Sequence, residues 1–193
     1  GLNMETMHAM ARDAAGQIPP QRLLRDGDRE VIQRHRGRLL ALGPEVVGAL
    51  EEVLYGRLPE GAGASRESLE YWWARTVTGP WDDDYLARMA LVGLMHVAKR
   101  VTNPMMLAAS DHVVQLIADE SVAFGIPDEE RRALLDAVGR VAGTVRVVIA
   151  WSHERAVSAA LYEAAGMPEG LLVRLRDQEV GAFLERARAE LNL

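Results

Sequence analysis

The sequence lacks cysteine and contains few aromatic residues: its 193 residues include four tryptophans, four tyrosines and two phenylalanines. Without cysteine, disulfides, thiolate metal sites and a cysteine nucleophile are excluded. Basic residues (22) are fewer than acidic ones (28), and this net charge of −6 argues against a dedicated nucleic-acid-binding surface. No apolar run reaches the roughly 18 residues of a membrane span, and the first ten residues do not resemble a signal peptide. We therefore expect a soluble, cytoplasmic, globular protein without membrane or nucleic-acid partners.

Strand patterns are nearly absent from the sequence. Alanine, leucine, arginine and glutamate dominate, and β-branched or aromatic residues rarely alternate with polar ones. Apolar residues make up 49% of the chain, which is enough for a proper core. The composition predicts an all-α protein of one domain or at most two, and six or seven helices with short connections are typical of a bundle or a globin-like sandwich.

The expected helices follow from stop and start signals along the chain. Gly-Pro pairs at 43–44 and 79–80, Asn103-Pro104 and the glycine at 166 separate periodic segments, and Asp28, Ser65 and Asp82 are the expected N-caps. The predicted helices cover residues 28–42, 44–58, 65–79, 82–100, 103–124, 128–165 and 171–191. Residues 1–26 show little periodicity and are expected to form a flexible arm, 27–165 one domain, and 166–193 a C-terminal helical extension.

Motifs of common enzymes are missing. None of the five histidines belongs to an HExxH or Glu-x-x-His pattern, and the sequence has neither a GxSxG elbow nor a glycine-rich phosphate loop. The aspartates at 82–84 suit the positive end of a helix dipole better than a metal site. We expect no dedicated enzyme.

His96 lies among apolar residues, from Val92 to Ala98. An imidazole buried in such company without a partner costs about 1–3 kcal/mol. Two partners are open at this point: a backbone carbonyl, as for an ordinary core histidine, or a haem iron, for which neutral histidine is a usual axial ligand.

Several motifs around His96 occur in an order that resembles the protoglobin and globin-coupled sensor family. They are Trp72, the run Gly79-Pro-Trp-Asp-Asp-Asp-Tyr85, Arg88, the run Val92-Gly-Leu-Met-His96, and Ile149-Ala-Trp-Ser-His153 near the end of the last globin-like helix. The resemblance covers roughly residues 28–160. It implies a globin-like helical sandwich that binds haem b, with His96 as the proximal iron ligand. It further implies binding of a diatomic gas (O₂, NO or CO), either as a gas sensor domain or as a single-domain protoglobin.

The resemblance places haem between the second and third predicted helices on the distal side and the fourth on the proximal side. Gly93 would let the porphyrin approach the helix, and Lys99, with Arg75, Arg88 and Arg100, is a candidate partner of the propionates. The cofactor-binding residues expected beside His96 are Val47, Leu50, Glu51, Leu69, Trp72, Trp73, Val92, Gly93, Met95 and Lys99.

The distal side departs from the family pattern. Family members often have a tyrosine that donates a hydrogen bond to bound oxygen, and the matching positions here are Leu50 and Glu51. A buried, protonated Glu51 would donate. Alternatively Glu51 turns outward and leaves an apolar pocket, or Tyr55, one turn further on, is the donor.

The family resemblance also implies a homodimer through the last two globin helices. The apolar residues expected there are Val113, Val114, Leu116, Ile117, Val145, Val147, Val148 and Ile149. The main alternative function is a haem-free globin-like signalling or protein-interaction module. A third is an unrelated helical ligand-binding domain, such as the regulatory half of a transcription repressor.

Overall fold

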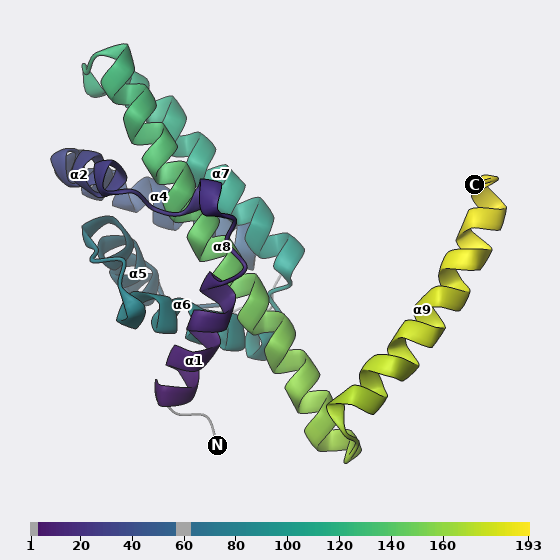
Figure 1. Cartoon of the computed structure of the whole chain (residues 1–193). Coiled ribbons are helices and arrows are strands. Elements are labelled where there is room, and N and C mark those ends of the chain that lie inside the picture. Colours follow the sequence, from purple (N-terminus) through teal and green to yellow (C-terminus); the bar gives the residue numbers. More distant parts are fainter. Residues whose placement is uncertain (1–3, 57–62) are drawn as a thin grey trace. The chain divides into compact units, whose positions relative to one another are not determined.

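The computed structural model describes residues 4–56 and 63–193, and all regular elements in these two stretches are helices, which confirms the all-α class. The chain divides into two compact units, Gly1–His153 and Glu154–Leu193, which are treated separately below. Figure 1 shows the elements. They are α1 (Met4–Ala15), η1 (Pro20–Arg22), α2 (Asp26–Arg34), α3 (Arg36–Ala41), α4 (Gly43–Leu50), η2 (Glu51–Tyr55, a π-helical turn), α5 (Arg66–Thr78), α6 (Asp83–Lys99), α7 (Asn103–Ser121), η3 (Val122–Phe124), α8 (Asp128–Ala165) and α9 (Glu169–Leu191).

Two of the three expected N-caps are confirmed. Ser65 Oγ accepts a hydrogen bond from Ser68 N at 3.1 Å, and Asp82 Oδ1 accepts one from Tyr85 N at 3.0 Å. Asp28 is not an N-cap, because α2 begins two residues earlier; its carboxylate accepts the Arg25 amide from inside the first turn. The predicted first helix is also divided at His35, between α2 and α3.

From Met4 onward, the N-terminal segment is not the flexible arm expected from the sequence. Its residues from Met4 to Ala15 form α1, which packs against α6. Met7, Ala11 and Ala14 are all buried, and their spacing of four and three residues puts them along one helical face. Two of them are alanines, which give a weak apolar signal in the sequence.

Helix α7 and the part of α8 that belongs to the first unit are joined by side-chain hydrogen bonds. Arg146 Nε donates to Ser110 Oγ at 2.8 Å, and Asn103 Nδ2 donates to Ala150 O at 3.3 Å. A largely buried ion pair of 3.0 Å between Asp28 and Arg140 ties α2 to α8. These polar contacts fix how α2, α7 and α8 pack around the apolar core.

Five of the eight apolar residues expected at a dimer interface instead belong to the core of the first unit. Val113, Ile117, Val145, Val148 and Ile149 are at most 7% exposed. They cannot cover a second copy while they pack inside their own protomer. The other three, Val114, Leu116 and Val147, are half-buried.

The second unit contains the end of α8 and all of α9. It begins at Glu154, inside α8, whereas the sequence placed the start of the extension at residue 166. Arg155 and Glu169 form an exposed 3.0 Å ion pair within it, and α9 has no buried residue. Among the helices described in both units, none has the length and apolar character needed to cross a membrane.

The turn between α5 and α6 is built by side chains that bond back to its backbone. Gly79 has φ +71°, which favours glycine, and the Gly79–Pro80 peptide is cis. Arg75 donates to Pro80 O at 2.7 Å, and Trp81 Nε1 donates to Thr76 O at 2.8 Å. Tyr85, fully buried just beyond this turn, shares a 2.9 Å hydrogen bond with Thr76 Oγ1.

Burial raises the pKa of Tyr85 to about 12. Because the unfolded chain releases the phenol proton near pH 10 and the folded chain retains it, the free energy of unfolding should fall as pH rises from about 10 to 12, by about 2–3 kcal/mol. Urea unfolding at several alkaline pH values should show a shallower decline for Tyr85→Phe. Tyr71→Phe, at an exposed position, is the matched control; equal slopes for both variants would contradict the prediction.

Candidate functional site

The first unit contains a partly open cavity of about 200 Å³ lined by side chains from α2 to α8. One water occupies only about 10–15 Å³ on this measure, so the space is much larger than a packing defect. Protein interiors are otherwise close-packed, and an unfilled cavity of this size lowers the free energy of unfolding. The cavity is therefore the candidate ligand site.

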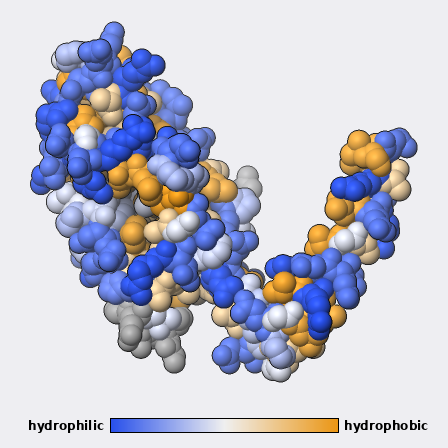
Figure 2. Space-filling view, viewed as in Figure 1, coloured by the Kyte–Doolittle hydropathy of each residue, from blue (hydrophilic) through white to orange (hydrophobic). Residues whose placement is uncertain are grey.

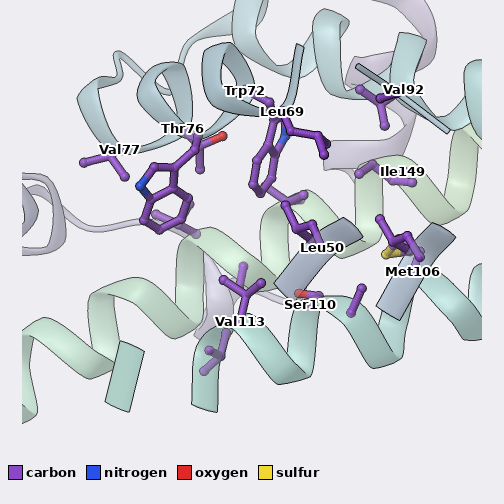
Figure 3. A pocket seen from close by; sticks show the side chains of 18 of the residues that line it. Leu50, Leu69, Trp72, Thr76, Val77, Val92, Met106, Ser110, Val113 and Ile149 are labelled. Carbon is purple, nitrogen blue, oxygen red and sulfur yellow. The ribbon is translucent and has the colours of Figure 1, made fainter. Parts of the chain in front are cut away.

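Figure 3 shows how the lining is arranged. Leu50 from α4 lies close to Leu69 and Trp72 of α5, whereas Thr76 and Val77 of α5 lie further along the cavity. Met106 of α7 and Ile149 of α8 lie on the other side of Leu50. Almost all of the lining is hydrocarbon, so the cavity suits a large apolar ligand.

Most of the expected cofactor-binding residues do meet in this cavity. Those that line it are Leu50, Leu69, Trp72, Trp73, Val92, Met95, His96 and Lys99. The three that do not line it are Val47, Glu51 and Gly93. Val47 is fully buried elsewhere in the core.

Glu51 turns outward. Its side chain is 41% exposed and forms a 2.6 Å ion pair with Arg66 at the start of α5. A carboxylate held at the surface by a guanidinium does not reach the cavity. Of the two orientations that the sequence left open for Glu51, the outward one is observed. Glu51 is therefore not a distal donor. The side chain of Tyr55, the alternative donor, lies outside the described residues.

Gly93 faces α8 and not the cavity. A Cβ at this position would lie 1.8 Å from Ser152 Oγ and 2.7 Å from Ile149 O. The missing side chain therefore allows α6 to approach α8 closely. The expectation that Gly93 makes room for a porphyrin was wrong, because the space that the glycine opens is filled by α8.

His96 differs from the other polar groups of the cavity wall in its hydrogen bonding. It is 8% exposed, and its Nδ1 is fully buried without a hydrogen-bond partner among the described residues. Burial, together with electrostatic interactions with His153 and Lys99, lowers the pKa of His96 to about 4. The imidazole is thus neutral near pH 7. One of its two ring nitrogens then carries a lone pair, which can accept a hydrogen bond or bind a metal.

Other polar groups of the lining already have partners within the protein. Trp73 Nε1 donates to Leu39 O at 2.9 Å, Thr76 bonds to Tyr85, and Ser110 accepts from Arg146. Trp72 Nε1 points to Met89 Sδ at 3.4 Å. These groups hold the helices together, so among the described lining residues His96 is the one with a buried side-chain nitrogen that lacks a hydrogen-bond partner.

Among the four basic residues considered for anionic groups, Lys99 lines the cavity. Its Nζ donates to Gly63 O at 3.2 Å. Arg75 and Arg88 instead pair with Asp82 and Asp84, at 3.2 and 2.8 Å. Arg100 ends α6 in a left-handed conformation. Of these four side chains, Lys99 is therefore the one placed beside His96, one turn further along α6.

Sequence reasoning missed the wall contributed by α7 and α8. It includes Met106, Ala109, Ser110, Val113 and Ile117 of α7, whose spacings of three and four residues follow one helical face. That periodicity was visible in the sequence, but Val113 and Ile117 were assigned to a dimer interface. An apolar helical face does not reveal whether it covers a ligand, a core or a partner.

No protein-family model and no curated protein sequence matches the chain. Within the described stretches, no three His, Cys, Asp or Glu side chains gather in a way that could hold a metal ion. The candidate site therefore rests on the cavity and on His96 themselves.

The contact at Gly93 gives a direct test of this geometry. Gly93→Ala should lower the free energy of unfolding by about 2–3 kcal/mol, because the added methyl overlaps α8. Gly48→Ala in α4, where a Cβ meets nothing within 4 Å, should raise it by about 0.5–1 kcal/mol. Urea denaturation measures both changes in the free energy of unfolding. Similar unfolding midpoints for the two variants would mean that α6 and α8 are further apart at Gly93 than described above.

Proposed function

We propose that the chain is a haem-binding globin that holds haem b in this cavity, with His96 as the axial ligand, and binds a diatomic gas. The observation that carries the proposal is a buried, neutral imidazole with an unpartnered nitrogen in the wall of a large apolar cavity. The motif resemblance around His96 supports the same assignment, including a globin-like arrangement of the first unit.

The residues present fit this group in three respects. The lowered pKa of His96 favours the neutral form that ligates iron. The apolar lining, with Leu50, Leu69 and Trp72 on one wall, would bury a planar hydrophobic ring and exclude water. Lys99, a basic residue of the lining, would pair with a carboxylate of the cofactor.

The cofactor would supply an iron atom able to coordinate O₂, NO or CO; the chain supplies its surroundings. Trp73, Thr76 and Ser110 are committed to hydrogen bonds within the protein, and Glu51 lies outside. A gas molecule in the cavity would therefore meet mainly hydrocarbon. The low polarity of the cavity, more than the fold, would govern which gas the cofactor prefers. The proposal covers both a sensor domain and a self-contained protoglobin.

Haem titration of the ligand-free protein tests the assignment of His96. The absorbance of the Soret band should saturate at one haem per chain, and His96→Ala should shift the band and weaken binding by about tenfold or more. His112→Ala, an exposed histidine of α7, is the control and should match the wild type. A saturable band that is the same in both variants would refute His96 as ligand; no specific band at all would favour the haem-free interaction module.

A second variant tests the cavity without touching His96. Ala109→Leu should fill part of the space from α7, raise the free energy of unfolding of the ligand-free protein by about 1 kcal/mol, and lower haem affinity by roughly tenfold. Ala108→Leu is the same change at the neighbouring exposed position and should leave haem affinity unchanged. Equal haem affinities would place the cofactor elsewhere.

A further inference from the structure

The C-terminal helix α9 carries large apolar side chains that nothing described in its own unit covers. Val180, Phe183 and Leu184 are 53%, 57% and 49% exposed, and Leu191 is 68% exposed. Figure 2 shows orange, hydrophobic groups along this helix. A group of exposed apolar side chains on one helix marks an interaction surface, whereas single exposed apolar residues are normal.

These side chains follow the spacing of a helix-pairing surface. Val173, Arg176, Val180, Phe183, Ala187 and Glu190 recur at alternating intervals of three and four residues, and we call this row the α9 stripe. The same alternation places residues along the contact line of two helices that pack knobs into holes. Leu184 and Leu191 widen the stripe on one side.

Two charges on the α9 stripe are placed symmetrically. Arg176 lies seven residues before Phe183, and Glu190 lies seven residues after it. If two copies of α9 pair antiparallel about Phe183, each Arg176 meets the Glu190 of the other helix, and this happens twice because of the two-fold axis. An in-register parallel pair would instead bring like charges together.

A second pair of charges agrees with the antiparallel orientation. Glu179 and Arg186 flank the α9 stripe on one side and are symmetric about almost the same point, between residues 182 and 183. In an antiparallel pair, flanking positions of this kind face each other across the interface, so Glu179 would face Arg186 of the second helix. Both charge pairs thus select the same orientation.

The stripe charges are available for such contacts. Arg176 bonds to its exposed neighbour Asp177 at 3.0 Å, a surface pair of little energetic value. Glu190 makes no ion pair with the described residues. Arg186 lies over the Phe183 ring, 5.1 Å from its centroid, which covers one side of the ring and leaves the residue 57% exposed.

From these observations we propose that α9 is a self-association surface that pairs antiparallel with α9 of a second copy of the chain. The pairing buries the α9 stripe and satisfies Arg176 and Glu190 across the two-fold axis. It is independent of the cofactor proposal, because no residue of the cavity takes part.

Charge exchange on the 193-residue chain tests the pairing. Sedimentation velocity over a wide concentration range should show a monomer–dimer equilibrium, and R176E or E190R should each raise the dimer dissociation constant by about tenfold, since each creates two like-charge contacts. The double variant R176E/E190R should restore dimerisation. R174E, E185R and their double variant make the same charge changes away from the stripe and should change little; circular dichroism checks that all variants stay helical.

Cross-linking tests the orientation, because the chain has no cysteine of its own. Leu184→Cys, near the two-fold axis, should form a disulfide-linked dimer under mild oxidation. Val173→Cys should not, because the antiparallel pair separates its two copies by about 30 Å along the helix axis. A chain that stays monomeric, a dimer that persists unchanged in R176E, a double variant without rescue, or efficient cross-linking through residue 173 would each overturn the proposal.

Discussion

The close approach of α6 to α8 at Gly93 is the constraint on which the arrangement of the site depends. Any side chain at this position would overlap Ser152 and the backbone of α8. Because α6 is held against α8 on this face, His96, one turn later, is directed into the cavity wall and away from solvent. The hydrogen bond from His153 to Val101 O, 3.1 Å long, fixes the end of α6 against the same part of α8. Helix packing, and not local sequence, thereby sets the environment of the imidazole.

The chemistry of the cavity follows from how its polar groups are satisfied. Trp73, Thr76 and Ser110 face a space lined by hydrocarbon, yet their hydrogen bonds go to Leu39, Tyr85 and Arg146 and stabilise contacts between helices. A buried polar group without such a partner is costly, so His96 is an exception that calls for an explanation. An axial role toward haem iron would explain it, and the lowered pKa that keeps the ring neutral is compatible with that role.

Local signals in the sequence were sufficient for much of the fold. Ser65 and Asp82 were identified as N-caps because capping depends on a side chain and an amide three residues later. The α5–α6 boundary followed from Gly79-Pro80, because glycine adopts the positive φ found there and proline does not continue a helix. By contrast, α1 was missed because its buried face is made largely of alanine, and burial against α6 is a long-range effect. The division at His35 was missed as well; the ring bonds Glu130 of α8 at 2.9 Å, a contact that no local pattern indicates.

The sequence by itself determined the helical class, most helix boundaries and the apolar surroundings of His96, because these depend on composition, periodicity and neighbours within one turn. Only the tertiary structure decided which way Glu51 turns, since its partner Arg66 lies on the next helix. The same holds for Gly93, which meets α8, and for Val113 and Ile117, which line the cavity and not a dimer interface. A helical face has the same pattern in the sequence whatever covers it, so the choice among core, ligand and partner is made by packing between distant segments.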